Sequence, residues 1–101
     1  MELESDIKEQ IKDYLNYTGW VSFPLSENKF GTKGLSDRVA LKDGIVLWIE
    51  IKRKGGKQSK DQIKFQDMID NAGCYYCLAY SAEDVDNFIF KITGKKSLLF
   101  Y

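Results

Sequence analysis

The spacing of apolar residues along the chain predicts helices with short strands between them. Residues 4–17, about 60–72 and roughly 82–91 show the three-and-four spacing of amphipathic helices. The apolar tail, residues 97–101, is a candidate further strand. Shorter runs rich in β-branched and aromatic residues predict strands at residues 20–23, 37–41, 45–52 and 74–80. The predicted order is therefore α-β-β-β-α-β-α, which is the pattern of an α/β domain.

Turn and cap residues mark the boundaries of these elements. Asp43-Gly44 is a favoured two-residue turn, so the second and third strands should form a hairpin. Ser59 is the candidate N-cap of the second helix, and Gln62 lies three residues later, which is the spacing of a capping box. Residues 25–35 form a polar loop between the first strand and the hairpin.

The bulk composition fits one globular domain. The chain has 101 residues, which is enough for one core and too few for two, with 44% hydrophobic and 30% charged residues. No apolar run approaches the roughly 18 residues of a membrane span, and the acidic N-terminus is unlike a signal peptide. We therefore expect a single intracellular domain over residues 1–101 that has no membrane partner.

The histidine and cysteine content of the sequence limits the kinds of catalytic and metal site that it can form. The sequence has no histidine, which excludes histidine-based triads, histidine zinc sites and histidine general bases. Cys74 and Cys77 have the C-x-x-C spacing of half a zinc site or of a redox motif. There is no second pair, and positions i and i+3 of a strand point to opposite faces. We interpret both cysteines as ordinary thiols in or near the core.

The net charge is zero, but the charges are unevenly distributed. In the stretch 52–64 only Asp61 opposes the cations, which are Lys52, Arg53, Lys54, Lys57, Lys60 and Lys64. A local basic patch can contact phosphates even in a neutral protein. The candidate DNA-binding residues are Arg53, Lys54, Lys57 and Lys60. A solvated loop and helix face is the alternative interpretation of the same charges.

Glu50 and Lys52 are the residues that most need an explanation. They follow the dense apolar run 45–49, and side chains two apart in a strand share a face. Partly buried charges are costly unless they are paired or bind a metal. An ion pair on an edge strand would explain the two residues alone, so further chemistry depends on what lies beside them.

The hairpin register gives Glu50 a neighbour. With a two-residue loop, Lys42 pairs with Ile45. Counting outward from that pair places Asp37 directly opposite Glu50, with Cβ atoms about 4.5–5.5 Å apart, unless a bulge shifts the register by one. Two like charges there are destabilising, and a bridging divalent cation would reverse the sign of their interaction. Carboxylate oxygens suit Mg²⁺ or Mn²⁺.

Further polar residues fall near this pair. Lys52 lies on the same face and could stabilise a developing negative charge or orient a water nucleophile. Glu4 is on the inward face of the first helix, where it is either a further metal ligand or an acid favoured by the helix dipole. Gln62 shares a face with Phe65, so it either reaches the site or only completes the cap of Ser59.

With these residues in view, the chain resembles the VRR-NUC branch of the PD-(D/E)xK nuclease superfamily, in its short stand-alone, phage-type form. The resemblance covers about residues 4 to 86. One departure is Ser36, where the superfamily often has proline. The matching segments are Glu4-Ser5-Asp6-Ile7, Tyr14-Leu15, Gly19-Trp20, Gly34-Leu35-Ser36-Asp37, Glu50-Ile51-Lys52, Gly56-Lys57-Gln58-Ser59 with Gln62, and Asn71-Ala72-Gly73 before the last strand.

The resemblance implies a fold, a cofactor and a set of roles. The fold is the restriction-endonuclease-like αβββαβ core, a mixed central sheet flanked by helices. The implied metal ligands, for Mg²⁺ or Mn²⁺, are Glu4, Asp37, Glu50 and the backbone carbonyl of Ile51. Lys52 is the implied catalytic lysine, and Gln62 supports the site. The implied activity is metal-dependent hydrolysis of phosphodiester bonds in DNA.

The substrate class follows from size and from the same resemblance. A small domain offers little surface for reading sequence, and stand-alone VRR-NUC proteins are similar to Holliday-junction resolvases that act as homodimers. We therefore expect branched DNA, a four-way junction, as substrate, with the tail 98–101 in a dimer interface and, for a phage protein, the host cell as location. The alternatives are a flap or nicking nuclease, an idle DNA-binding module, and a structural domain with a fortuitous ion pair.

Overall fold

The elements of the computed structural model follow the predicted order. The structure describes residues 2–26 and 31–100. Glu50 lies near the middle of the chain, in the third strand. The helices and strands are α1 (Glu4–Tyr17), β1 (Val21–Pro24), β2 (Arg38–Lys42), β3 (Ile45–Ile51), α2 (Lys60–Asn71), β4 (Tyr75–Ala79), α3 (Ala82–Thr93) and the short 3₁₀ helix η1 (Leu98–Phe100).

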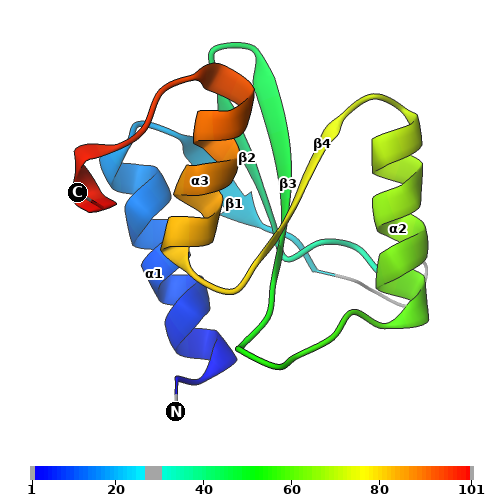
Figure 1. Ribbon diagram of the computed structural model, residues 1–101. Coiled ribbons are helices and arrows are strands. Elements are labelled where there is room, and N and C mark those ends of the chain that lie inside the picture. The colour runs from blue at the N-terminus through cyan, green and yellow to red at the C-terminus, as the bar shows by residue number, and fades with distance from the viewer. Residues whose placement is uncertain (1, 27–30, 101) are drawn as a thin grey trace.

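The four strands form one mixed sheet in the order β1-β2-β3-β4. The first three are antiparallel neighbours, whereas β4 runs parallel to β3 and is reached through α2. Helices α1 and α3 lie together on one side of the sheet, and α2 lies on the other (Figure 1). This confirms the predicted α/β class with a mixed central sheet flanked by helices.

The predicted hairpin register is confirmed. Lys42 pairs with Ile45, and the same register extends to Arg38 opposite Ile49. The turn between them has positive φ at Asp43, 51°, and at Gly44, 80°, as the mirror-image turns that suit tightly twisted hairpins require.

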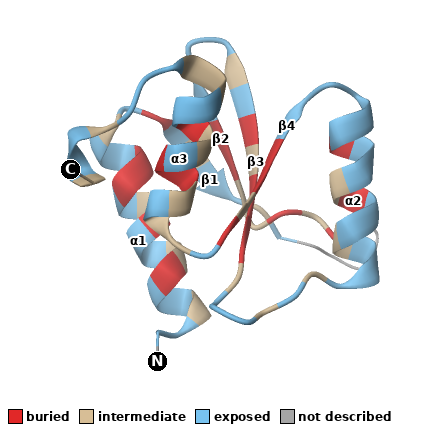
Figure 2. Ribbon diagram, in the orientation of Figure 1, coloured by how far each residue is buried: buried red, intermediate tan, exposed pale blue. Residues whose placement is uncertain are grey.

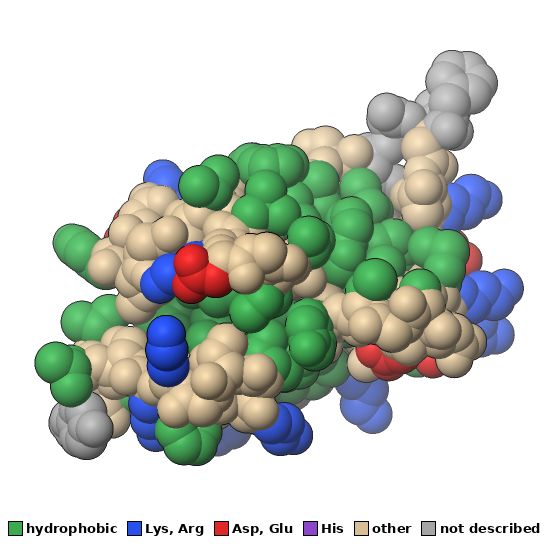
Figure 3. Space-filling model, turned by 90° about the horizontal axis from the view of Figure 1, so that it is seen from above, with side chains coloured by type: hydrophobic (Ala, Val, Ile, Leu, Met, Phe, Trp, Pro, Cys, Tyr) green, Lys and Arg blue, Asp and Glu red, His purple; other side chains and the backbone are tan. Residues whose placement is uncertain are grey.

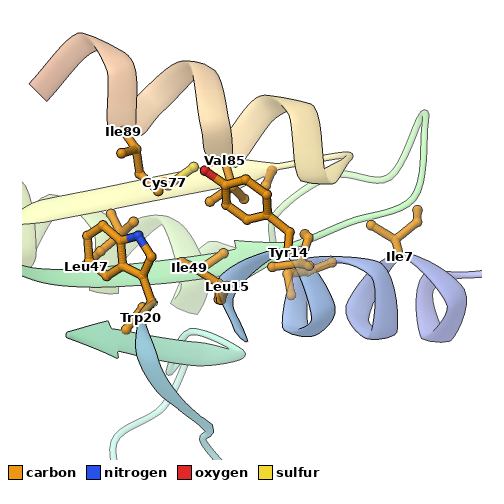
Figure 4. Packing of buried hydrophobic residues seen from close by; sticks show 13 residues of the cluster. Ile7, Tyr14, Leu15, Trp20, Leu47, Ile49, Cys77, Val85 and Ile89 are labelled. Carbon is orange, nitrogen blue, oxygen red and sulfur yellow. The ribbon is translucent and has the colours of Figure 1, made fainter. Parts of the chain in front are cut away.

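The main core lies between the sheet and the α1–α3 pair. Its large members point inward from α1, β3, β4 and α3 (Figure 4), and the burial colours show the same stripe on each element (Figure 2). A smaller cluster on the other side joins α2 to the sheet through Phe65, Ile69 and Tyr76, with Trp48 edge-on to Phe65 at 5.7 Å between ring centroids. Two cores therefore hold β3 from both faces, which explains its continuous apolar run.

Part of the sheet face on the α2 side is not covered. Val21, Leu41 and Val46 pair across β1, β2 and β3, so they share one face, and they are 64%, 36% and 42% exposed. Phe23, one step along β1, is 46% exposed. We call these four residues the apolar sheet surface. Seen from above, the molecule also has a broad group of apolar side chains on its surface (Figure 3).

The C-terminal tail differs from its prediction. Residues 98–100 form η1 and not a strand. Phe100 packs on Tyr14 of α1, with ring centroids 5.9 Å apart, and the Ser97 N–H donates to Asp86. These contacts with the helix layer hold the tail away from the sheet edges, so it has no strand to pair with.

Smaller details complete the fold. Cys77 is buried in the main core and Cys74 is exposed, and both are free thiols. The last helix runs two residues further than predicted, to Thr93, and ends at Gly94 in the left-handed conformation. None of the helices in the described ranges is long and apolar enough to cross a bilayer.

Candidate active site

The candidate site lies where β2 begins and β3 ends, beside the first turn of α1. Asp37 directly precedes β2, and its Oδ2 accepts a hydrogen bond of 2.7 Å from the backbone N–H of Ile51. The carboxylate therefore crosses to the end of the neighbouring strand. This bond fixes one oxygen of Asp37 and leaves the other, Oδ1, facing α1.

Glu50 is buried beside Asp37, at 1% exposure. Burial and the neighbouring Asp37 raise the pKa of its carboxyl, Lys52 partly offsets the increase, and the result is a pKa of about 8. Glu50 Oε2 accepts from Gln62 Nε2 at 3.1 Å and lies 3.5 Å from Lys52 Nζ. Glu50 Oε1 is buried without a hydrogen-bond partner. A buried carboxylate oxygen with no donor costs free energy, so Glu50 needs either a proton or a cation at this atom.

Both the backbone and the side chain of Lys52 keep this residue close to Glu50. Its backbone N–H donates to Ala79 at 3.0 Å, which continues the β3–β4 pairing one step past the end of β3. Its side chain is only 16% exposed. The ammonium is therefore kept beside the carboxylate pair and does not move freely in solvent.

Gln62 both completes the cap of Ser59 and reaches Glu50. Its Oε1 accepts the Ser59 N–H at 2.8 Å, and the Gln62 N–H donates to Ser59 Oγ at 3.2 Å, which completes the predicted capping box. The Nε2 of the same amide donates to Glu50. The cap of α2 thus orients a side chain that supports the site.

Glu4 is near the site but does not join the carboxylate pair. Its side chain is 40% exposed and forms an ion pair with Lys8 Nζ, at 3.3 Å. In the described part of the chain, no three acidic or cysteine side chains are grouped closely enough to hold a metal ion. The structure therefore brings together Asp37 and Glu50, and connects Glu4 to them only through a lysine.

That lysine, Lys8, is the site residue that the sequence analysis missed. Its Nζ lies 3.2 Å from Asp37 Oδ1, so it bridges Asp37 and Glu4. Burial lowers the pKa of Lys8, but the two carboxylates raise it by more. The available signal was its position four residues after Glu4, next to the buried Ile7, which places it on the same side of α1 as the site.

The cations proposed to bind DNA lie on the loop that follows β3 and at the start of α2. Arg53, Lys54, Lys57 and Lys60 are all exposed. The loop itself is attached to the protein by neutral groups, since Gln58 Nε2 donates to the Tyr76 hydroxyl at 3.2 Å and Tyr80 donates to the Gly56 carbonyl at 3.4 Å. The loop thus presents its charges to solvent from a fixed backbone.

The site fits a divalent cation in two respects. Its donor atoms are carboxylate and carbonyl oxygens, which Mg²⁺ and Mn²⁺ prefer. Glu50 Oε1 has no partner. A cavity of about 120 Å³ lies beside Asp37 and is lined, among the described residues, by Lys8, Pro24, Leu25, Asp37, Arg38 and Ile51, so Glu50 does not line it. A larger cavity, of about 680 Å³, lies between the end of α1, the hairpin turn and the tail, and no candidate site residue lines it.

Comparison with known proteins adds evidence on the fold. No family model and no curated protein matches the sequence. Among solved structures, a VRR_NUC domain superposes with a TM-score of 0.74 over 85% of this chain and 92% of that chain, at 20% sequence identity. At that identity the likeness concerns the fold and leaves the chemistry to the residues. The fold implied by the sequence resemblance is therefore confirmed: this chain folds as a VRR_NUC domain does.

Proposed function

We propose that this protein is a metal-dependent endonuclease that hydrolyses phosphodiester bonds in DNA. The observation that carries the proposal is the buried Glu50 beside Asp37, with one Glu50 oxygen unpartnered. Two adjacent carboxylates in a desolvated place oppose folding unless a cation neutralises them. The fold is that of a VRR_NUC domain, and the name of that domain points to a nuclease.

The proposed metal ligands come from both strands of the hairpin. Asp37, Glu50 and the backbone carbonyl of Ile51 would hold Mg²⁺ or Mn²⁺, with Glu4 assisting from α1. When bound, such an ion polarises a phosphoryl oxygen and lowers the pKa of water. The Ile51 N–H keeps the Asp37 carboxylate oriented for this role, at 2.7 Å.

Lys52 is the proposed catalytic lysine. It carries its charge on the face that holds Glu50, and its low exposure of 16% means that little water screens that charge. A fixed cation there stabilises the negative charge that develops on the phosphate during hydrolysis. Gln62 acts through Glu50, which it holds by the 3.1 Å hydrogen bond, and is therefore a positioning residue.

The exposed cations beside the site supply the proposed DNA contacts. Arg53, Lys54, Lys57 and Lys60 follow Lys52 along the chain, on the loop and at the start of α2. Such residues bind backbone phosphates without reading sequence. They would bring a phosphodiester group to the carboxylate pair.

For the substrate we propose branched DNA, a four-way junction, cut by a homodimer. Two symmetric incisions need two active sites, and a two-fold dimer supplies them from one small chain. The apolar sheet surface supports this proposal, because adjoining exposed apolar residues mark association sites in soluble proteins. It is a better candidate for the interface than the tail, since Phe100 of the tail already packs on Tyr14.

The test is cleavage of a substrate panel in Mg²⁺ and in Mn²⁺. A four-way junction, a flap and a plain duplex would be incubated with wild-type protein and with Asp37→Asn, and the cuts on each strand would be mapped. We expect paired nicks near the junction crossover and a loss of at least about 100-fold in rate for Asp37→Asn, which loses a charged ligand. Asp43→Asn, in the exposed hairpin turn, is the matched control and should cut normally.

Each outcome separates the alternatives. A single nick in the flap, with the junction intact, identifies a flap or nicking nuclease. Binding of all substrates without cleavage in either metal identifies an idle DNA-binding module. Wild-type activity in Asp37→Asn contradicts the assigned site.

A further inference from the structure

Lys8 places a positive charge between two acids that are candidate metal ligands. Its Nζ lies 3.3 Å from Glu4 Oε2 and 3.2 Å from Asp37 Oδ1. The other Asp37 oxygen already accepts the Ile51 N–H. The ammonium therefore takes the oxygen of Asp37 that remains available for a ligand, and it is also the group that connects Glu4 to the site.

The surroundings of Lys8 would let another cation replace it. Its side chain is 43% exposed, and it lies beside the 120 Å³ cavity that Asp37 and Ile51 also line. The helix does not depend on Lys8 for its position, because Ile7 and Ile11, at 2% and 0% exposure, anchor α1 in the main core. The lysine can therefore leave Asp37 by a change of rotamer, without repacking the core.

We propose that Lys8 is a built-in counter-ion, which holds Glu4 and Asp37 in the metal-free protein and which a divalent cation must displace in order to bind there. The inference rests on the proposed function, because it takes Asp37 to be a metal ligand. Lys8 then has two effects of opposite sign. It stabilises the metal-free fold by pairing with the acids, and it weakens metal binding by competing for the same oxygen atoms.

Lys12 is a matched control for Lys8. It lies one turn further along α1, pairs with Glu9 at 3.4 Å and is 45% exposed. A lysine that only stabilises the helix would behave as Lys12 does. Metal affinity therefore separates a counter-ion at the site from a merely structural lysine.

The experiment is titration of the purified protein with Mn²⁺, without DNA, followed by calorimetry. Lys8→Met should bind Mn²⁺ about tenfold more tightly than wild type, which is the size of effect expected from one unit charge removed next to a partly exposed ion. Lys12→Met and the charge-preserving Lys8→Arg should match wild type. Mn²⁺ should also raise the Tm of Lys8→Met by more than it raises the Tm of wild type, since tighter binding to the folded state stabilises it more.

The outcomes distinguish this inference from the proposed function. Equal Mn²⁺ affinity in wild type, Lys8→Met and Lys12→Met overturns the role of Lys8 and leaves the nuclease proposal standing. Absence of Mn²⁺ binding in all variants overturns both. Lys8→Gln is a second neutral variant, to be used if Lys8→Met does not fold, and the same comparison then applies to it.

Discussion

At the scale of single residues, Glu50 carries an energetic conflict, because its carboxyl is fully buried. It lies next to another carboxylate. The groups that stabilise its negative charge are the Lys52 ammonium, 3.5 Å away, and the Gln62 amide. In the absence of metal the folded protein therefore keeps a proton on Glu50 at pH values where the unfolded chain has lost it.

Replacement of Glu50 by glutamine should expose this conflict. The ordinary pKa of 4.5 rises to about 8 in the folded state, so wild-type stability in EDTA should fall as pH rises between these values and level off above them. Glu50→Gln cannot ionise and should be more stable than wild type at pH 9, by on the order of 2–4 kcal/mol. The gain should disappear near pH 5, as measured by urea unfolding at each pH.

The same variant should bind no Mn²⁺ and cut no DNA, so stability and function would change in opposite directions. Asp43→Asn is the control, because Asp43 is exposed in the hairpin turn and lies outside the site. Identical pH dependence of unfolding in wild type and Glu50→Gln would show that Glu50 does not retain a proton in the folded state.

At the scale of elements, the basic loop between β3 and α2 makes a separate prediction. Lys57→Met and Lys60→Met should each weaken binding of every DNA substrate to a similar degree, because contacts to phosphates carry no sequence information. Each should also lower the slope of log K against log salt by about 1. Fluorescence anisotropy with labelled DNA in Ca²⁺, over a range of salt concentrations, measures both quantities.

The control for the loop is Lys91, an exposed lysine near the end of α3. Lys91→Met should keep both the affinity and the salt slope of wild type. If it weakens binding as much as the loop variants do, DNA contacts the helix layer and the proposed orientation is wrong.

The elements also show what could be predicted from sequence. The hairpin register and the capping box of Ser59 were predictable, since each depends on the chemistry of a few neighbouring residues. The bridge made by Lys8 was not, because it requires the first turn of α1 to dock beside Asp37. The helical tail was missed for a similar reason, because its shape follows from the contact of Phe100 with Tyr14.

At the scale of the whole molecule, the uncovered part of the sheet predicts association. Val21→Lys should weaken dimer formation at least about tenfold, because it would place a charge within the proposed apolar interface. Val21 is 64% exposed in the single chain, so the substitution should leave the fold intact. Sedimentation, with and without junction DNA, measures the effect.

Leu98→Lys tests the tail as the alternative interface, since Leu98 is 80% exposed. It should leave the dimer unchanged. A monomeric Leu98→Lys beside a dimeric Val21→Lys would move the interface to the tail, and a wild-type monomer at all concentrations would contradict the two-site cutting mechanism.

The residues of the site are close together in the sequence, and this has a consequence for folding. Asp37, Glu50 and Lys52 all belong to one hairpin, so closing it requires a loop of only about fifteen residues, for which the entropy cost is small. Hairpins form within roughly 1–10 μs, whereas the parallel pairing of β3 with β4 must wait for the α2 crossover. The carboxylate pair is therefore expected to assemble before the sheet is complete, so its mutual repulsion would act on the rate of folding as well as on the stability of the final state.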